Sequence, residues 1–160
     1  TRPLVIALNT QSGISAELID LRVACHPVRL LADCETHTKL PQPLITPYSM
    51  LPEDVQIALS GKEIFDFGLN VQPDIFSFEV NHCTIPTSLV VAYALAVASS
   101  GQAKRVFMAG FDGYEGEDPR NYETNMLFKQ FQKTNGAVEI QCITPTRYDI
   151  PCKSVYGEPL

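Results

Sequence analysis

The sequence predicts an α/β fold: a single, doubly wound, mainly parallel sheet flanked by helices. Short apolar runs alternate along the chain with patterns of helical period. Over residues 75–143 the order is strand, helix, strand, helix, strand, as in parallel strands joined by crossover helices. With 160 residues, 45% of them hydrophobic and 19% charged, the chain has the size and composition of one globular domain.

The first half of the chain contains short predicted elements. Residues 4–8 are a continuous apolar run, typical of a buried strand, that ends at Asn9. Apolar residues at helical spacing predict a helix within residues 14–24, and residues 28–32 are predicted as a second strand. Four prolines within residues 41–52 predict a surface loop or an insertion.

The next predicted helix, residues 52–59, has proline at its start, two acidic residues in its first turn and glycine after its end. Strands are predicted at residues 63–67 and 75–80. The best-defined helix follows, with Thr87 or Ser88 as its N-cap and an apolar run at residues 89–98. Because this run is apolar on every side, we expect the helix at the centre of the domain. A buried strand at 105–109, a helix at 122–133 and a strand at 138–143 complete the pattern.

The charge balance excludes two classes of partner. Twelve basic and eighteen acidic residues give a net charge of −6, and no basic stripe exists for a nucleic acid or an anionic membrane surface. No apolar run is long enough to span a bilayer, and no signal peptide is recognisable. We therefore expect a cytoplasmic protein, and the apolar run directly after Thr1 indicates a fragment excised just before a strand.

The five cysteines are odd in number and form no C-x-x-C motif, which favours reduced thiols over a disulfide framework. Cys25, His26, Cys34 and His37 are four potential zinc ligands within a short segment. Cys25 and His26 are adjacent, however, which suits tetrahedral ligation poorly, and the spacing matches no standard zinc motif. We expect no metal and no other cofactor in this fragment.

Three turns are candidate ligand sites, because ligands of open α/β sheets bind beyond the carboxyl ends of the strands. The first follows residues 4–8 and begins at Asn9. The second contains Thr87 and Ser88, where the start of a helix can hold a phosphate or carboxylate. The third follows residues 105–109. It offers Gly110, Asp112 and Tyr114.

Each candidate also has a purely structural interpretation. Thr87 and Ser88 can be a helix cap alone, Asn9 the start of a turn, Asp112 a cap and Tyr114 a cover for the core edge. His82, shortly before the second turn, is a candidate general base or a polar loop residue. The sequence contains no G-x-G-x-x-G, Walker or G-x-S-x-G motif, so dinucleotide, P-loop and hydrolase chemistry lack support.

These segments carry a family resemblance. Thr87-Ser88 with its alanine-rich helix, residues 105–114, and the strand leading to Thr144-Pro145-Thr146 resemble the second half of bacterial sialyltransferases that modify lipooligosaccharide. They are still more similar to the sialyltransferase-like C-terminal domain of 4-hydroxy-2-oxovalerate aldolase-type proteins from surface-polysaccharide gene clusters. The resemblance extends over residues 4–156 and is most specific at residues 109–114. It implies a Rossmann-like domain cut from a parent whose N-terminal aldolase barrel, a lyase, precedes it.

The resemblance also implies site residues. Asn9 corresponds to a donor-binding asparagine and Thr87-Ser88 to a Thr-Ser pair, although Leu89 replaces the glycine that follows in the family. Tyr114 and Tyr122 are counterparts of tyrosines that stabilise the leaving phosphate. The family's glycine-rich loop would lie upstream of Thr1.

The catalytic histidine of the family has no counterpart in residues 115–137, so transfer would need a replacement base. The candidates for that base are Glu115, Glu117, Asp118 and His82. We therefore predict an accessory module that binds a nucleotide-sugar or a sugar acid and is not catalytic alone. Two alternatives stay open: an active transferase using a CMP-sugar donor, and an oligomerisation or docking domain without a ligand. The aldolase reaction belongs to the parent, since a barrel needs about 250 residues.

Overall fold

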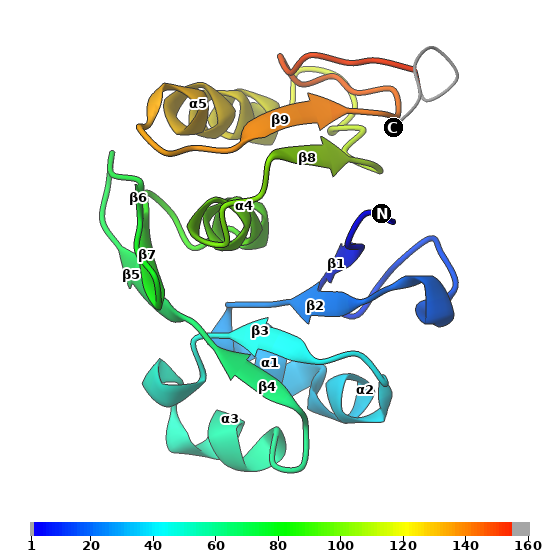
Figure 1. Ribbon diagram of the computed structural model, residues 1–160, viewed down its shortest axis with the longest axis vertical. Coiled ribbons are helices and arrows are strands. Elements are labelled where there is room, and N and C mark those ends of the chain that lie inside the picture. The colour runs from blue at the N-terminus through cyan, green and yellow to red at the C-terminus, as the bar shows by residue number, and fades with distance from the viewer. Residues whose placement is uncertain (1, 155–160) are drawn as a thin grey trace.

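Three β-sheets gathered around helix α4 form the fold of residues 2–154, the residues that this computed structural model describes (Figure 1). The predicted α/β class is confirmed, since parallel strands and helices alternate along the chain. The expectation of a single sheet is wrong for the described residues, whose strands are hydrogen-bonded in three separate groups.

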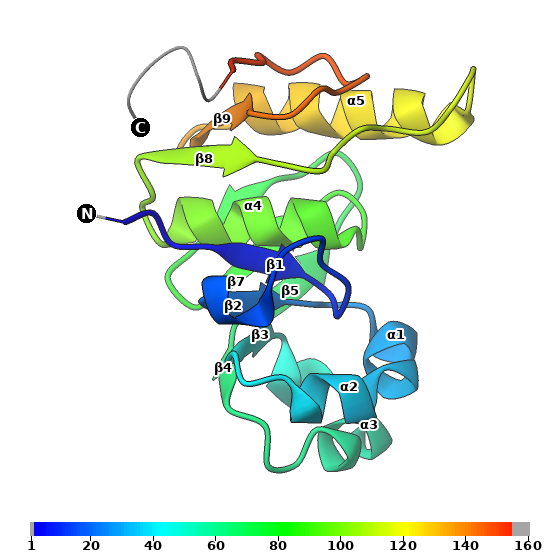
Figure 2. The ribbon, with the colours of Figure 1, turned by 90° about the vertical axis from the view of Figure 1, so that its right-hand side faces the viewer.

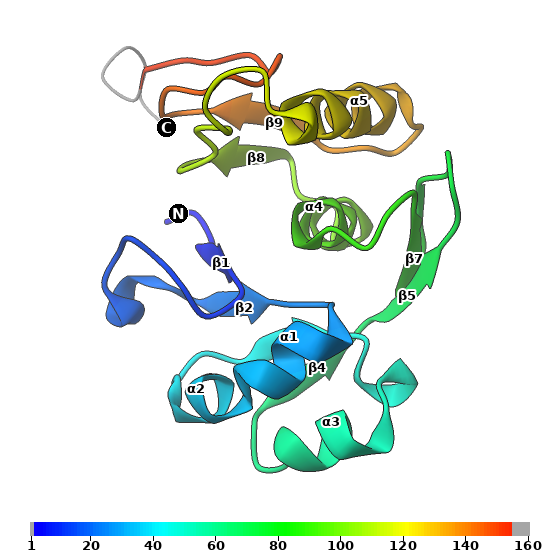
Figure 3. The same ribbon diagram turned by 180° about the vertical axis from the view of Figure 1, so that it is seen from behind.

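Sheet A contains four parallel strands in the order β1-β2-β3-β4. They are β1 (Ile6–Leu8), β2 (Leu21–Val23), β3 (Leu44–Thr46) and β4 (Ile64–Asp66). The connections between them contain the 3-10 helices η1 (Ala16–Leu18) and η2 (Tyr48–Met50) and the helices α1 (Pro27–Ala32), α2 (Cys34–Lys39) and α3 (Glu53–Ala58). Leu44 packs with residues of α1 and α3, whereas Ile45 packs in the larger cluster around α4. Successive residues of a strand face opposite sides, so helices cover both faces of sheet A (Figure 3).

Sheet B has the order β5-β7-β6, with β7 parallel to β5 and antiparallel to β6. Its strands are β5 (Gly68–Val71), β6 (Ser77–Phe78) and β7 (His82–Ile85). The chain passes from sheet A to sheet B within two residues: Phe67 N donates to Thr46 O of β3 (3.1 Å), and Gly68 N donates to Asn81 O beside β7 (2.9 Å). A Cβ atom at position 68 would lie 2.8 Å from His82 Cβ, so this close approach requires glycine.

Helix α4 (Val90–Ser100) packs against strands of sheets A and B, and its chain continues into sheet C (Figure 2). Sheet C consists of the parallel strands β8 (Arg105–Met108) and β9 (Glu139–Cys142). Helix α5 (Pro119–Lys133) connects them and buries Leu127, Phe128 and Phe131. Residues of all three sheets, α4 and α5 meet in one large core, in which Tyr93 and Ala96 are completely buried.

Several elements match their predictions. These are β1, α3, β4, α4, β8, α5 and β9, which lie within or beside the segments predicted for them. Helix α5 begins three residues earlier than predicted, because Pro119 occupies its first position and the Asp118 side chain accepts a hydrogen bond from Arg120 N. The strand predicted at residues 75–80 is reduced to β6.

Three predictions in the first half are wrong. The segment 14–24, predicted as a helix, contains η1 and strand β2. The segment 28–32, predicted as a strand, belongs to helix α1, which begins at Pro27. The predicted surface loop at 41–52 contains β3, whose three residues are buried between flanking prolines. At β2 and β3, pairing with neighbouring strands outweighs the local signal of these short segments.

Two further predictions fail in the second half. Neither Thr87 nor Ser88 is the N-cap of α4: Leu89 takes that position, and no side chain caps the helix. Strand β8 is not a buried strand, since Arg105 and Phe107 are exposed. Within the described residues, no helix has the length and apolar character needed to cross a membrane.

Candidate functional site

The turn after β1 is held by a buried arginine. Asn9 adopts a left-handed conformation (φ 55°), and its N–H donates to Val23 O at the end of β2 (2.8 Å). Arg22 Nη1 donates to the carbonyl oxygens of Asn9 (3.0 Å) and Thr10 (3.1 Å). The guanidinium therefore fixes both carbonyl groups of the turn that the sequence predicts as a ligand site.

Arg22 itself is only 1% exposed. Its Nε donates to Gln42 Oε1 (3.0 Å), and Gln42 Nε2 donates to Ala16 O. Burial lowers the pKa of Arg22, but an arginine keeps its proton in proteins. The charge thus lies beneath the carboxyl end of β1, among neutral carbonyl and amide acceptors. Sequence reasoning missed Arg22, although a charged residue between Leu21 and Val23 was a usable signal.

The second predicted turn lies at the end of β2. Cys25 Sγ approaches Ser88 O at 3.9 Å, which brings the turn before α4 to the strand that also holds Asn9. Thr87 and Ser88 are exposed. Because no side chain of the described residues caps α4, the first N–H groups of this helix keep their capacity to bind an anion. The structure therefore brings both Asn9 and Ser88 near the end of strand β2.

The third turn, after β8, is tied to the segment that follows β9. Gly110 has a left-handed conformation (φ 74°), and its N–H donates to Thr144 Oγ1 (2.9 Å). Arg147 N donates to the carbonyl oxygen of Asp112 (3.0 Å), and Thr146 Oγ1 donates to Phe111 O. Figure 2 places the carboxyl ends of β1 and β8 on the same side of the molecule, but no hydrogen bond between described residues joins the two turns.

Tyr114 is fixed from the start of α5. Its backbone N–H donates to Asn121 Oδ1, and Asn121 Nδ2 donates to its carbonyl oxygen, both at 2.8 Å. The Arg120 guanidinium stacks over the Tyr114 ring at 3.7 Å from the ring centre. Tyr122 is 70% exposed. The phenol of Tyr114 is thus a positioned group, whereas Tyr122 is a surface side chain.

Asp118, one of the candidate bases, is the ionised N-cap residue of helix α5. Its carboxylate pairs with Arg120, with oxygen–nitrogen distances of 2.7 and 2.9 Å. The hydrogen bonds from the Arg120 side chain and backbone lower the pKa of Asp118 to about 2. A carboxylate of such low basicity is a poor proton acceptor at neutral pH. Glu115 and Glu117 are exposed in the same loop.

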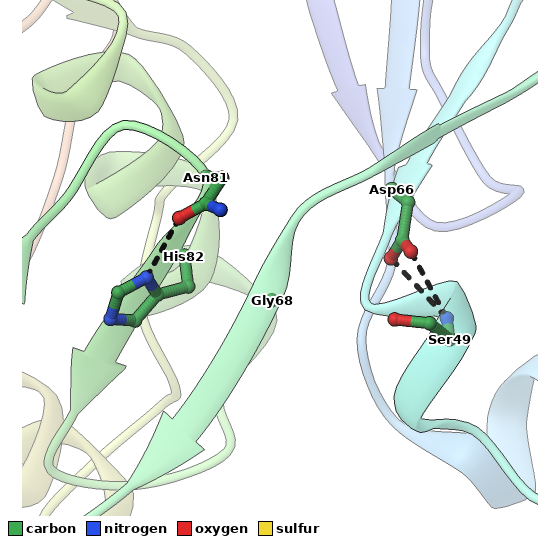
Figure 4. Close-up of a pocket in the computed structure, with 5 residues that line it drawn as sticks. All are labelled: Ser49, Asp66, Gly68, Asn81 and His82. Carbon is green, nitrogen blue, oxygen red and sulfur yellow. Dashed lines mark hydrogen bonds between the residues drawn. The ribbon is translucent and has the colours of Figure 1, made fainter.

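His82 lies in a different place from the three turns. It begins β7, whereas Thr87 follows the end of that strand, so β7 separates the two. An open cavity of about 290 Å³ is lined by Ser49, Asp66, Gly68, Asn81 and His82 (Figure 4). Ser49 N donates to both oxygens of Asp66 at 3.3 Å, and His82 Nδ1 lies 3.0 Å from Asn81 Oδ1. The cavity is at the carboxyl ends of β3 and β4, on the same edge of sheet A as Asn9.

The four potential zinc ligands do not converge. Cys25 belongs to the large core around α4, whereas His37 is buried in α2 on the other side of sheet A. In residues 2–154, no three His, Cys, Asp or Glu side chains come together as a metal site would require. Comparisons with protein-family models, curated proteins and solved structures return no match for this chain.

Proposed function

We propose that this chain is a sialyltransferase-like domain that binds a nucleotide-sugar or a sugar acid at the carboxyl edge of sheet A. The observation that carries the proposal is the placement of Asn9 and Ser88 around the end of β2. Both residues belong to turns that the sequence predicts as ligand sites because each turn follows a strand. In open α/β sheets, such neighbouring turns form the crevice in which ligands bind.

The local charge supports an anionic ligand in a protein of net charge −6. The Arg22 guanidinium holds a carbonyl group of the Asn9 turn, and the start of α4, which no side chain of the described residues caps, follows Ser88. A helix N-terminus carries a partial positive charge that favours carboxylate and phosphate groups. A sugar acid or a nucleotide diphosphate supplies such groups.

The wider role that we propose follows the family resemblance. The domain is a Rossmann-like, doubly wound accessory unit of an aldolase-type lyase in bacterial surface-polysaccharide synthesis, acting in the cytoplasm without a cofactor of its own. Its partners are the ligand and the aldolase barrel, with homo-oligomers as a further arrangement. Nothing in this role requires a catalytic base near Asn9, and the low basicity of Asp118 fits a binding domain.

A transferase is the second candidate, favoured by one observation. His82 and Asp66 both line this cavity, and an imidazole or a carboxylate there can accept a proton from an acceptor hydroxyl. Turnover of a CMP-sugar that is lost in His82→Gln would establish this candidate. Donor hydrolysis unchanged in His82→Gln would assign the turnover to other residues.

The binding proposal is tested by thermal shift with CMP, CMP-sialic acid, UDP-sugars and GDP-sugars. A ligand at about a hundred times its Kd adds about 2.7 kcal/mol, which moves the midpoint by a few degrees. We expect a shift with one ligand class that is lost in Asn9→Gly and in Ser88→Ala. Glycine is chosen at position 9 because it tolerates the left-handed backbone.

The matched control is Ser60→Ala, an exposed serine after α3 on the far side of sheet A. It should keep the full ligand shift. A shift that survives both site variants would move the ligand away from the end of β2. Absence of any shift would leave the docking role as the remaining hypothesis.

A further inference from the structure

Strands β1 and β8 are outer strands of their sheets, and one edge of each pairs with no other strand of residues 2–154. Sheet A ends at β1 and sheet C ends at β8. In all three ribbon views β1 is the strand of sheet A nearest to sheet C, and Figure 2 shows β1 and β8 running in the same direction. Side chains of both strands pack on the same large core. The two edges thus face each other above a shared apolar base.

The hydrogen bonds identify the backbone groups along the edge of β1. Val5 O accepts from Asp20 N (2.9 Å) and Leu21 N (3.2 Å), and Asn9 N donates to Val23 O (2.8 Å). Backbone groups of successive residues in a strand point to opposite sides. The N–H and C=O groups of Ile6 and Leu8 therefore point away from β2, toward sheet C.

The same reasoning applies to β8. Ile143 N donates to Met108 O (3.0 Å), so the backbone groups of Val106 and Met108 face β9. The groups of Arg105 and Phe107 then point toward β1. The outer edges of β1 and β8 thus carry two rows of parallel-strand donors and acceptors that are directed toward each other.

The side chains of β1 are unusually apolar for a strand at an edge. Natural edge strands are protected by charges, prolines or bulges. The segment Leu4–Leu8 contains only apolar residues, and Leu4 is 63% exposed. Phe107 is 36% exposed in β8. Continuous apolar runs of this kind belong to parallel strands with neighbours on both sides.

We propose that one further β-strand pairs with the outer edges of both β1 and β8: an apolar segment that runs parallel to the two strands and precedes β1 in the polypeptide. The order of sheet A supports this source. Each strand from β1 to β4 is added beside its predecessor in one direction, so the strand before β1 belongs on the other side of β1. The added strand would join sheets A and C into one parallel sheet in the order β4-β3-β2-β1-new strand-β8-β9. This proposal is independent of the ligand proposed above.

The test uses the 160-residue chain with an N-terminal extension. A strand of about five alternating valine and isoleucine residues is joined to Thr1 by about twenty glycine and serine residues, enough for a parallel crossover. The control extension has proline at every second strand position, which removes the donors that pair with β1 or β8. Amide hydrogen exchange of Ile6, Leu8 and Phe107 is measured by NMR, with Ala7 and Val106 as internal references.

We expect the valine and isoleucine extension to slow exchange at Ile6, Leu8 and Phe107 by about tenfold or more, and the proline extension to leave it unchanged. Equal exchange with both extensions would overturn the proposal. A free peptide of the same strand sequence with terminal lysines, compared with its proline form, gives a second measurement if the extended chain fails to fold. Slower amide exchange with the strand peptide but not with its proline form would support the proposal. Unchanged amide exchange with both peptides would overturn it.

The unextended chain distinguishes other segments that could pair with the outer edges of β1 and β8. We expect Ile6, Leu8 and Phe107 to exchange faster than Ala7 and Val106 at all protein concentrations. Slow exchange that strengthens with protein concentration would assign the pairing of these edges to a second copy of the chain. Slow exchange independent of concentration would assign it to another part of the same chain, and either result would overturn the proposal.

Discussion

The Nη1 atom of Arg22 lies 3.0 Å from the carbonyl oxygen of Asn9, so a buried charge in one strand holds the turn after its neighbour. The same nitrogen reaches Thr10 O at 3.1 Å. The shape of the proposed ligand site thus depends on a residue that need not touch a ligand.

Replacement of Arg22 tests this support. In Arg22→Met the buried Gln42 side chain and the partly buried carbonyl groups of Asn9 and Thr10 lose their donor, and we expect a loss of about 2–4 kcal/mol in the free energy of unfolding. Urea unfolding measures it. The control is Arg105→Met, which removes an exposed ion pair with Glu139 and should cost less than about 1 kcal/mol. Equal effects in the two variants would contradict the role given to Arg22.

His37 should make stability depend on pH. Its side chain is 2% exposed, and its Nδ1 has no hydrogen-bond partner among the described residues. Burial lowers the pKa of His37 below its ordinary 6.5; Lys62 and Arg22 act in the same direction, and Asp33 opposes them. As the pH falls below 6.5, His37 takes up a proton in the unfolded chain but stays neutral in the folded chain. Protonation therefore favours the unfolded chain, and the stability present above pH 6.5 is progressively lost at lower pH.

The measurement is the urea midpoint between pH 5 and 8 for the wild type and His37→Gln. We expect a flatter dependence in the variant, since glutamine does not titrate there. His26→Gln, at an exposed position before α1, should keep the wild-type dependence. A wild-type slope in His37→Gln would assign the acid sensitivity to other groups.

Gly68 should tolerate no side chain. Its replacement by alanine sets a Cβ 2.8 Å from His82 Cβ, and relief requires a shift between β5 and β7. We expect Gly68→Ala to lower the free energy of unfolding by about 1–3 kcal/mol. Gly13→Ala, where no atom lies within 4 Å of the added Cβ, should change it by less than about 1 kcal/mol. Similar values at both positions would argue against the close approach.

Phe131 connects α5 to sheet B. It is fully buried, and its ring contacts Phe76 and Phe78 with centres 5.4 and 5.7 Å apart. Phe131→Ala should cost about 3–5 kcal/mol, because the cavity removes packing on the Phe76 and Phe78 rings. Met126→Ala alters a half-exposed side chain of the same helix and should cost well below that. Chemical denaturation of the two variants decides whether α5 is anchored at Phe131.

The cysteines should differ strongly in reactivity. Burial raises the pKa of Cys25 and of Cys83 to about 12, so hardly any thiolate exists at pH 8. Cys152 is exposed. Brief alkylation with iodoacetamide, followed by mass spectrometry, should label Cys152 and spare Cys25 and Cys83, whereas all five cysteines should react in urea. Labelling of Cys83 as fast as Cys152 would contradict its burial.

The sequence predicted the fold where an element is long or carries strong local signals. Helices α4 and α5 have ten or more residues of clear pattern, and β9 follows a glycine stop. The prediction failed at β2 and β3, which have three residues each. Apolar spacing from Ile14 to Leu21 imitates a helix, and the prolines around β3 imitate a loop, so only pairing across sheet A defines these strands.

The candidate site was predicted in part for a related reason. Asn9 and Ser88 were selected because they follow strands, and parallel pairing brings them to one edge. Arg22 was missed because its segment was interpreted as a helix, where a charged residue belongs on the solvent side. Asp66 was missed because its place in the cavity depends on the passage of the chain from sheet A to sheet B.

Helix α4 contacts β1, β2, β6 and β7 and leads directly into β8. None of the three sheets can therefore complete its apolar contacts before residues 90–100 have docked. Assembly of the domain is coupled through this one segment, even though the sheets share no hydrogen-bonded ladder. Removing an apolar contact of α4 weakens several sheets at once, so the described chain should lose its structure in a single cooperative step instead of sheet by sheet.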